Sequence, residues 1–276
     1  MRAKKSLGQN FLVDPNAQRR IVEALDARPN DEVLEIGPGH GALTDHLAGR
    51  VGRLVLVELD DQLAAALTAR FADQASVQVV HADVLTVAPD AVLRDVGRAR
   101  VVGNIPYNIT TPILFHLLDA RPRPERIVLM VQREVADRIL AEPGGKTYGA
   151  LSVGVRAVAD AKRVLHVKRG AFRPVPDVDS TVVLITPHRP PRLSPDEEAD
   201  LRVLTRETFG RRRKQLGTTL RSAPEYGLDV EALESLATST GIDMRRRPET
   251  LSPEEFVTLA RALREAGLPK HLGPTA

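Results

Sequence analysis

The first half of the chain alternates short apolar segments with segments of helical periodicity. The apolar segments are rich in β-branched residues, which is typical of strands buried on both faces of a parallel sheet. They are Val33–Ile36, Leu54–Val57, Val77–Val80, Arg100–Val102 and Ile127–Val131. Helical patterns such as Gln62–Phe71 and Thr111–Asp119 lie between them. Strands that alternate with helices predict an α/β fold whose sheet is covered by helices on both faces.

The pattern changes after residue 150. Val164–Lys168 and Thr181–Ile185 read as two more strands and predict a hairpin that closes the sheet. The proline-rich run Pro187–Pro195 is the clearest linker in the chain. Four helical segments follow it: Asp196–Phe209, Arg212–Ser222, Val230–Ser239 and Pro253–Ala266. We therefore predict an α/β domain over residues 1–189 and a small all-helical domain over residues 190–276.

Composition excludes several classes of protein. The chain has no cysteine, so it cannot form a disulfide, a zinc–thiolate site or a cysteine nucleophile. No apolar run reaches the roughly 18 residues of a membrane-spanning helix. The basic N-terminus lacks the apolar stretch of a secretory signal. We expect a soluble, cytoplasmic protein, and no metal site is predicted.

A glycine-rich turn follows the first predicted strand. Gly37, Gly39 and Gly41 can adopt a positive φ and let the backbone approach a ligand closely. Their spacing differs from the G-x-G-x-x-G of dinucleotide-binding folds. Pro38 also removes an N–H group that a diphosphate would use. S-adenosylmethionine has no phosphate, so the turn fits that cofactor better than a nicotinamide dinucleotide, although a turn without any ligand remains an alternative.

Carboxylates follow the next two predicted strands. Glu58 ends the second strand, where an acid can accept hydrogen bonds from both ribose hydroxyls. Asp83 follows the third strand and can accept from the adenine amino group. Taken singly, Glu58 could be a solvated charge and Asp83 a helix N-cap. Together with the glycine turn they predict a cofactor site in the switch-point crevice of a Rossmann-like, class I S-adenosylmethionine-dependent methyltransferase domain.

The segment Asn104-Ile105-Pro106-Tyr107 follows the fourth predicted strand. This segment suits methyl transfer to the exocyclic amine of a base. Such an amine is a poor nucleophile, because its lone pair is delocalised into the ring. Two acceptors bound to its NH2 group would draw the nitrogen toward tetrahedral geometry. The amide oxygen of Asn104 can be the first acceptor, and the carbonyl of Ile105, which Pro106 holds extended, can be the second. Tyr107 can stack on the base, which is worth roughly 1–3 kcal/mol; the alternative is a turn with a buried tyrosine.

With these motifs the chain resembles the ribosomal RNA adenine N6,N6-dimethyltransferases, the KsgA-type family with its Erm relatives, from Ser6 to about Leu263. The motif Gly8–Leu12 belongs to this resemblance, as does the motif from Phe172 to Ser180. The resemblance implies contacts to the cofactor from Asn10, Leu12, Gly37, Glu58, Asp83 and Asn104, and we add Gly39 from the glycine turn. It also implies that Phe172 and Tyr107 sandwich a flipped adenine. From the residues alone, Phe172 could equally be a core aromatic.

The segment Gly241–Phe256 resembles the small-subunit enzymes of the family more than their relatives. The resemblance implies that two adjacent adenines are dimethylated in a loop near the 3′ end of 16S ribosomal RNA, in the small (30S) subunit and during ribosome assembly. One position departs from the family pattern: Gly217 stands where the family usually has arginine. That departure removes one expected cation.

Basic residues gather in three clusters that the net charge of +3 conceals. Two lie in the predicted helical domain, and their members are Arg211, Arg212, Arg213, Lys214 and Arg221, and Arg245, Arg246 and Arg247. The third is Arg2, Lys4 and Lys5. Clusters of this kind predict phosphate contacts that position a protein on RNA. The alternative for each is a solvated face.

Three other functions stay open on the sequence. The first is an Erm-type enzyme that methylates 23S ribosomal RNA and confers antibiotic resistance. The second is a nucleic-acid-binding factor that keeps the fold without catalysis, and the third is a nicotinamide dehydrogenase. The intact Asn104–Tyr107 loop and the spacing of the glycine turn disfavour the last two. We expect a monomer.

Overall fold

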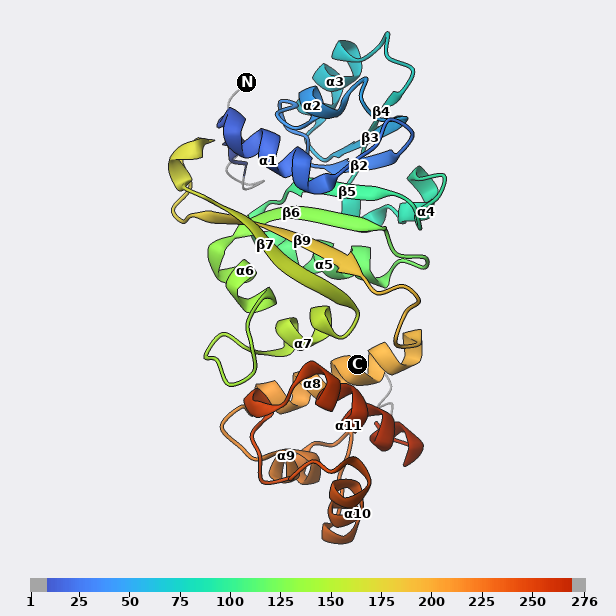
Figure 1. The fold of residues 1–276 in the computed structure, drawn as a ribbon, viewed down its shortest axis with the longest axis vertical. Coiled ribbons are helices and arrows are strands. Elements are labelled where there is room, and N and C mark those ends of the chain that lie inside the picture. Colours follow the sequence, from blue (N-terminus) through green and yellow to red (C-terminus); the bar gives the residue numbers. More distant parts are fainter. Residues whose placement is uncertain (1–8, 270–276) are drawn as a thin grey trace. The chain divides into compact units, whose positions relative to one another are not determined.

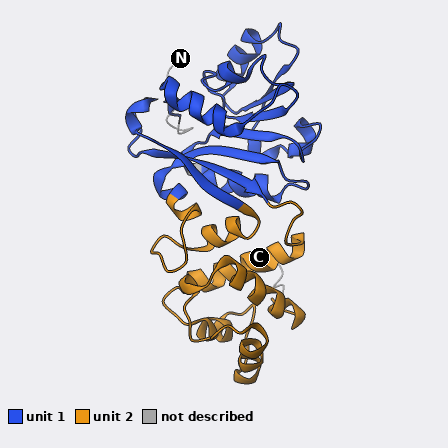
Figure 2. Cartoon of the chain, in the orientation of Figure 1, with its two compact units in different colours: residues 1–136, 160–187 blue, residues 137–159, 188–276 orange. Residues whose placement is uncertain are grey.

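The computed structural model describes residues 9–269, and the chain forms two compact units (Figures 1 and 2). The first unit comprises Met1–Ala136 and Asp160–Pro187. The second comprises Asp137–Ala159 and His188–Ala276. Within the described residues, no helix is both long and apolar enough to cross a membrane.

A seven-stranded sheet forms the centre of the first unit, in the order β4-β3-β2-β5-β6-β9-β7 (Figure 1). Its strands are β2 (Glu32–Ile36), β3 (Arg53–Glu58), β4 (Val77–His81), β5 (Arg100–Asn104), β6 (Arg126–Gln132), β7 (Ala159–Val167) and β9 (Ser180–Pro187). The pairings among β2 to β6 are parallel, and β9 runs antiparallel to β6. The predicted α/β fold, its five parallel strands and the closing pair of strands are therefore confirmed.

The strand order reverses at β2, which pairs with β3 on one side and with β5 on the other. Ile36 lies opposite Val57 of β3 and Gly103 of β5, so the carboxyl ends of the three strands meet at one edge. In open parallel sheets this switch point leaves a crevice in which ligands bind. The residues that directly follow β2, β3 and β5 are thus the ones that can share a site.

Most helices of this unit cover the sheet with buried apolar residues, whereas the short helix Pro89–Val92 has no buried residue. The helices are α1 (Pro15–Leu25), α2 (Thr44–Leu47), α3 (Asp61–Arg70), α4 (Pro89–Val92), α5 (Thr110–Asp119) and α6 (Arg133–Ile139). In α1, Ile21 and Leu25 are buried in the main hydrophobic cluster with strand residues such as Val33 and Val128. Short 3-10 turns, η2 (Val84–Thr86), η3 (Tyr107–Ile109) and η4 (Arg169–Ala171), follow strand ends. A separate two-stranded ladder joins β1 (Phe11–Leu12) to β8 (Phe172–Arg173).

The second unit is helical. It contains α7 (Ala150–Arg156), α8 (Pro195–Gly210), α9 (Leu216–Ser222), α10 (Val230–Thr240), η5 (Pro248–Thr250) and α11 (Pro253–Glu265). The ring of Phe209 lies 5.9 Å from that of Tyr148 and 5.5 Å from that of Phe256, between ring centroids. The Tyr148 hydroxyl donates to the carbonyl of Leu251 at 2.8 Å. These contacts make residues 137–159 part of the helical unit, which corrects the expectation that the α/β domain runs without interruption to residue 189.

Gly103 offers a test of the close packing at the switch point. A Cβ atom at this position would lie 2.8 Å from the Ile36 carbonyl oxygen and 2.8 Å from Cδ1 of Ile105. Gly103→Ala should therefore lower the free energy of unfolding by about 1–3 kcal/mol, because the backbone must shift. Urea unfolding measures this. Gly170→Ala is the matched control, since nothing lies within 4 Å of its Cβ position; equal stability of the two variants would contradict the account.

Candidate active site

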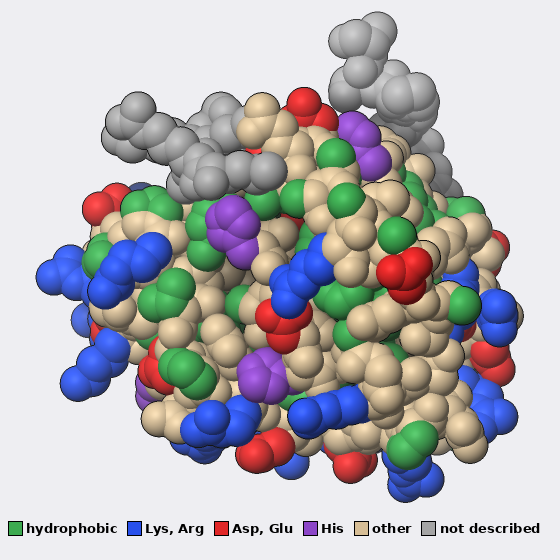
Figure 3. Space-filling view, turned by 90° about the horizontal axis from the view of Figure 1, so that it is seen from above, with side chains coloured by type: hydrophobic (Ala, Val, Ile, Leu, Met, Phe, Trp, Pro, Cys, Tyr) green, Lys and Arg blue, Asp and Glu red, His purple; other side chains and the backbone are tan. Residues whose placement is uncertain are grey.

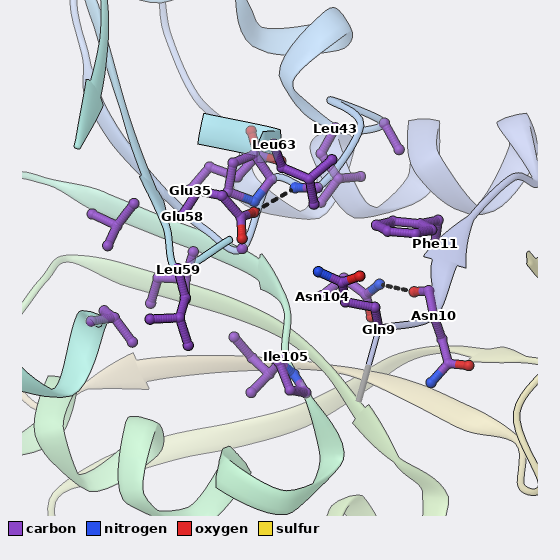
Figure 4. A pocket seen from close by; sticks show the side chains of 18 of the residues that line it. Gln9, Asn10, Phe11, Glu35, Leu43, Glu58, Leu59, Leu63, Asn104 and Ile105 are labelled. Atoms are coloured by element: carbon purple, nitrogen blue, oxygen red, sulfur yellow. Dashed lines mark hydrogen bonds between the residues drawn. The ribbon is translucent and has the colours of Figure 1, made fainter. Parts of the chain in front are cut away.

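A pocket of about 290 Å³ lies at the carboxyl ends of β2, β3 and β5 (Figure 4). The predicted cofactor and catalytic residues that line it are Asn10, Leu12, Gly37, Gly39, Glu58, Asp83, Asn104, Ile105, Pro106 and Tyr107. They come from segments far apart in the sequence. Parallel strand pairing brings together those at the ends of β2 to β5, and the N-terminal residues Asn10 and Leu12 join them at the pocket. All ten of these residues therefore lie around a single cavity, and Phe172 is the one predicted cofactor or catalytic residue that does not line it.

Backbone amides hold the two predicted carboxylates. The buried Glu58 accepts from the N–H of Gly39 at 3.0 Å through Oε2, and from that of Asp60 at 2.9 Å through Oε1. The Glu58 carboxylate is therefore held beside the glycine turn. Asp83 accepts from the N–H of Leu85 at 2.9 Å and also lines the pocket. It is thus both the N-cap of η2 and a wall of the cavity.

The glycine turn also approaches the N-terminal segment of the chain. Gly39 has a φ of 60°, and a Cβ atom there would lie 3.0 Å from the ring of Phe11. That ring packs on His40, with 4.2 Å between the two centroids. The absence of a side chain at Gly39 therefore makes room for Phe11, which is a role that the sequence did not reveal.

Hydrogen bonds fix the groups of the Asn104–Tyr107 loop. The Asn104 Nδ2 donates to the carbonyl of Asn10 at 2.8 Å, which leaves the amide Oδ1 as the acceptor that can meet a substrate (Figure 4). The hydroxyl of Tyr107 is 2.8 Å from Oγ of Ser180. Burial raises the pKa of the half-buried Tyr107 phenol, so this ring stays uncharged at neutral pH. The loop therefore presents a hydrogen-bond acceptor and a neutral aromatic ring to the cavity.

Glu35 is a pocket residue that the sequence analysis did not identify. It lies in β2, it is only 1% exposed, and its Oε2 accepts from the Thr44 hydroxyl at 2.7 Å. Burial raises the pKa of Glu35 to about 8, and the nearby Asp45 and Glu58 raise it further while the bond from Thr44 lowers it. The available signal was an acidic residue between the apolar residues Leu34 and Ile36 of a buried strand.

Phe172 does not face this pocket. Its side chain is 0% exposed and belongs to the main hydrophobic cluster, and its strand β8 pairs with Leu12 of β1. The expectation that Phe172 and Tyr107 sandwich a base therefore does not fit this geometry, and the ring takes the core position that was the alternative. The motif from Phe172 to Ser180 contributes to the site through Ser180, the hydrogen-bond partner of Tyr107.

The two arginine clusters of the second unit are joined through backbone hydrogen bonds. The N–H of Leu216 donates to the carbonyl of Arg246, and that of Gly217 to the carbonyl of Met244, both at 2.9 Å. A Cβ atom at Gly217 would lie only 3.3 Å from the Met244 oxygen. Glycine at this position thus suits close packing of α9 against the 244–246 segment.

About half of the predicted RNA-binding cations already have protein partners. Arg211 donates to Ser222 and Arg212 to the carbonyls of Gly145 and Lys146. Arg245 pairs with Asp243 at 2.9 Å, and Arg246 pairs with Glu255. The other four predicted cations have exposed side chains, and the described residues offer them no ion pair or hydrogen bond. They are Arg213, Lys214, Arg221 and Arg247. The third cluster, Arg2, Lys4 and Lys5, lies outside the described residues, as does Gly8.

One face of the molecule carries charges of both signs (Figure 3). On the face drawn in Figure 3, Lys and Arg side chains are interspersed with those of Asp and Glu. Mixed charge of this kind is what a solvated surface shows. Among the predicted RNA-binding cations, Arg213, Lys214, Arg221 and Arg247 are therefore the better candidates for phosphate contacts.

The buried Glu35 predicts a specific pH dependence of stability. Its folded pKa of about 8 lies above the ordinary value of 4.5, so the folded protein keeps a proton that the unfolded chain releases between these values. The free energy of unfolding should fall as pH rises through this window, by up to about 1.4 kcal/mol per pH unit. Glu35→Gln cannot titrate, so its stability should fall less between about pH 5 and about pH 8. Parallel pH profiles for the two proteins would show that Glu35 is ionised in the fold.

A family model described as ribosomal RNA adenine dimethylase matches residues 1–265. Ribosomal RNA small subunit methyltransferase A of Geobacter metallireducens is 45% identical over 97% of this chain and 98% of its own length. The protein of the same name from Moorella thermoacetica is 44% identical over 94% of this chain and 92% of its own.

Solved structures agree in fold. A dimethyladenosine transferase from Plasmodium falciparum superposes with a TM-score of 0.79, covering 94% of this chain and 98% of that one at 24% identity. The 23S rRNA methyltransferase ErmE gives a TM-score of 0.72, covering 92% of this chain and 100% of that one at 28% identity. Since the family model spans nearly the whole chain and the relatives match from end to end, the chain belongs to the ribosomal RNA adenine dimethylase family.

Proposed function

We propose that the protein dimethylates the N6 amino groups of two adjacent adenines near the 3′ end of 16S ribosomal RNA, with S-adenosylmethionine as the methyl donor. The observation that carries this proposal is the position of the Asn104–Tyr107 loop, which opens into the same pocket as Glu58 and Asp83. A loop suited to an exocyclic amine and a site suited to an adenosine therefore share one cavity.

The charge of the pocket supports this cofactor. Glu58 and Asp83 line the cavity, and its described lining includes no lysine or arginine. Glu35 also lines it but adds no charge near neutral pH, because burial raises its pKa to about 8. A diphosphate would meet carboxylates without a compensating cation, whereas the sulfonium and ammonium groups of S-adenosylmethionine would be attracted. Glu58 would accept from the ribose hydroxyls, and Asp83 from the adenine amino group. When bound, the cofactor supplies an electrophilic methyl group.

The residues of the chain would prepare the adenine for transfer. The Oδ1 of Asn104 and the carbonyl of Ile105 accept from the N6 amino group, so that the nitrogen lone pair points away from the ring. Pro106 has φ −54° and ψ 133°, so the backbone after Ile105 is extended rather than helical. Tyr107, fixed by Ser180, stacks on the flipped base. Catalysis is then positioning and dipole stabilisation, without a strong general base.

The choice of subunit rests on sequence likeness. The relatives named for the small subunit are 40–45% identical, whereas ErmE, titled as a 23S rRNA methyltransferase, is 28% identical. We therefore favour the small (30S) subunit as partner, with a monomeric enzyme that acts in the cytoplasm while subunits assemble. Methylation of 23S RNA is the second candidate, and a factor that binds RNA without catalysis is the third.

Methyl transfer from labelled S-adenosylmethionine tests the reaction and the subunit together. Small subunits that lack adenine dimethylation should take up label, and large subunits should not. Asn104→Ala should slow transfer by about 10²–10³-fold, because one preorganised acceptor is lost. The control is Asn30→Ala, because Asn30 is exposed and lies just before β2, at the amino ends of the strands and away from the pocket. Label confined to large subunits would move the protein to the second candidate.

Salt dependence tests the RNA surface. Arg213→Ala combined with Arg247→Ala should weaken binding to small subunits and lower the slope of log K against log salt by about 1.5, since two phosphate contacts are lost. Arg245→Ala removes a cation that pairs with Asp243, and should change the slope less. Equal slopes for all these proteins would show that Arg213 and Arg247 do not meet phosphates.

A further inference from the structure

The segment Gln9–Leu12, which we term the N-terminal strap, runs across the carboxyl ends of three strands. The Nε2 of Gln9 donates to Oδ2 of Asp60 at 2.9 Å, just beyond β3. The carbonyl of Asn10 accepts from Asn104 at the end of β5, and Phe11 packs beside the glycine turn after β2. Figure 4 shows Gln9, Asn10 and Phe11 around Asn104. The strap is therefore a wall of the pocket that contacts the segments after β2, β3 and β5.

Asp60 is a rigid anchor for this strap. It is 4% exposed, and its Oδ1 caps α3 by accepting from the N–H groups of Gln62 and Leu63 at 3.0 and 3.3 Å. Its own N–H donates to Glu58 at 2.9 Å. Because Oδ1 is committed to the helix, Oδ2 is the oxygen that faces Gln9. The bond from Gln9 thus ties the strap to a helix cap and to the carboxylate proposed to bind ribose.

The strap decides which end of the Asn104 amide faces the substrate. The two ends of an amide are nearly the same size, so hydrogen-bond partners determine its orientation. A carbonyl at Asn10 selects the NH2 end and leaves Oδ1 for the adenine amino group. If the strap moved, the Asn104 amide could rotate, and its NH2 group would then face the NH2 group of the adenine, so that neither could accept a hydrogen bond. Misplacement by about 1 Å can cost 10²-fold in rate.

We propose that Gln9 is a positioning residue for methyl transfer, which holds the strap on Asp60 so that the Asn10 carbonyl orients the Asn104 amide. The proposal rests on the proposed catalytic role of Asn104. Gln9 does not touch the reacting atoms in this scheme. It acts through Asp60 on one side and through Asn10 on the other.

Gln9→Glu breaks the bond while keeping the size of the side chain. Two carboxylates would then face each other where a 2.9 Å hydrogen bond now lies. We expect at least a tenfold loss of the single-turnover rate at saturating cofactor and RNA, a raised KM for the cofactor, and unchanged affinity for the ribosomal subunit. Gln62→Glu makes the same change at an exposed position beside Asp60 and should leave these constants within about twofold, because a negative charge is favourable in the first turn of a helix.

A second substitution should restore the bond. In Gln9→Glu with Asp60→Asn, the new amide must keep its oxygen on the α3 amides, so its NH2 group replaces Oδ2 and donates to the new carboxylate. We expect the double variant to recover to within about threefold of the wild-type rate. A single variant with wild-type rates, or a double variant as slow as Gln9→Glu, would overturn the proposal.

Two arrangements keep this test separate from the test of function. Transfer is measured on whichever ribosomal subunit the wild-type protein methylates. An error in the proposed subunit would therefore be detected with the wild-type protein and would not affect its comparison with the variants. The NMR signals of the Asn104 side-chain amide, identified by their loss in Asn104→Ala, need no RNA. They should shift in Gln9→Glu and return in the double variant; unmoved signals would overturn the proposal whatever the substrate.

Discussion

Parallel pairing of β2 with both β3 and β5 is the constraint on which the site depends. Each strand is buried and ends at the same edge, so the residues after Ile36, Val57 and Gly103 must share one crevice. Gly103 allows β5 to lie close to β2, and the next residue is Asn104. The position of the amide is therefore set by strand register, and its orientation by the strap.

The pocket and the helical unit differ in the charge that they offer. The cavity contains the acidic side chains of Glu35, Glu58 and Asp83, and Glu35 is buried enough to keep its proton near neutral pH. The second unit offers exposed arginines and a lysine near α9 and the 244–247 segment. Carboxylates suit a cationic, phosphate-free cofactor, and arginines suit RNA phosphates. In the proposed function the pocket would hold both the methyl donor and the target adenine, and the exposed cations of the second unit would bind RNA phosphates.

Local patterns predicted most of the fold and the pocket. The apolar segments gave the strands, and Glu58, Asp83 and Asn104 followed because carboxyl ends of parallel strands meet. Features that depend on contacts between distant residues were not predictable in this way. Tyr148 joins the helical unit through Phe209, Phe172 is buried by the pairing of β8 with β1, and Arg246 is neutralised by Glu255. Hydrophobic periodicity carries no information about any of these three partners.

The central claim is that this site modifies adenine N6 in small-subunit RNA. Its most direct test is mass spectrometry of that RNA, digested to nucleosides and to fragments after reaction with the wild-type protein. The account predicts N6,N6-dimethyladenosine at two adjacent positions near the 3′ end. Methyl groups on another atom or another base, or adenine methylation found only in 23S RNA, would contradict it.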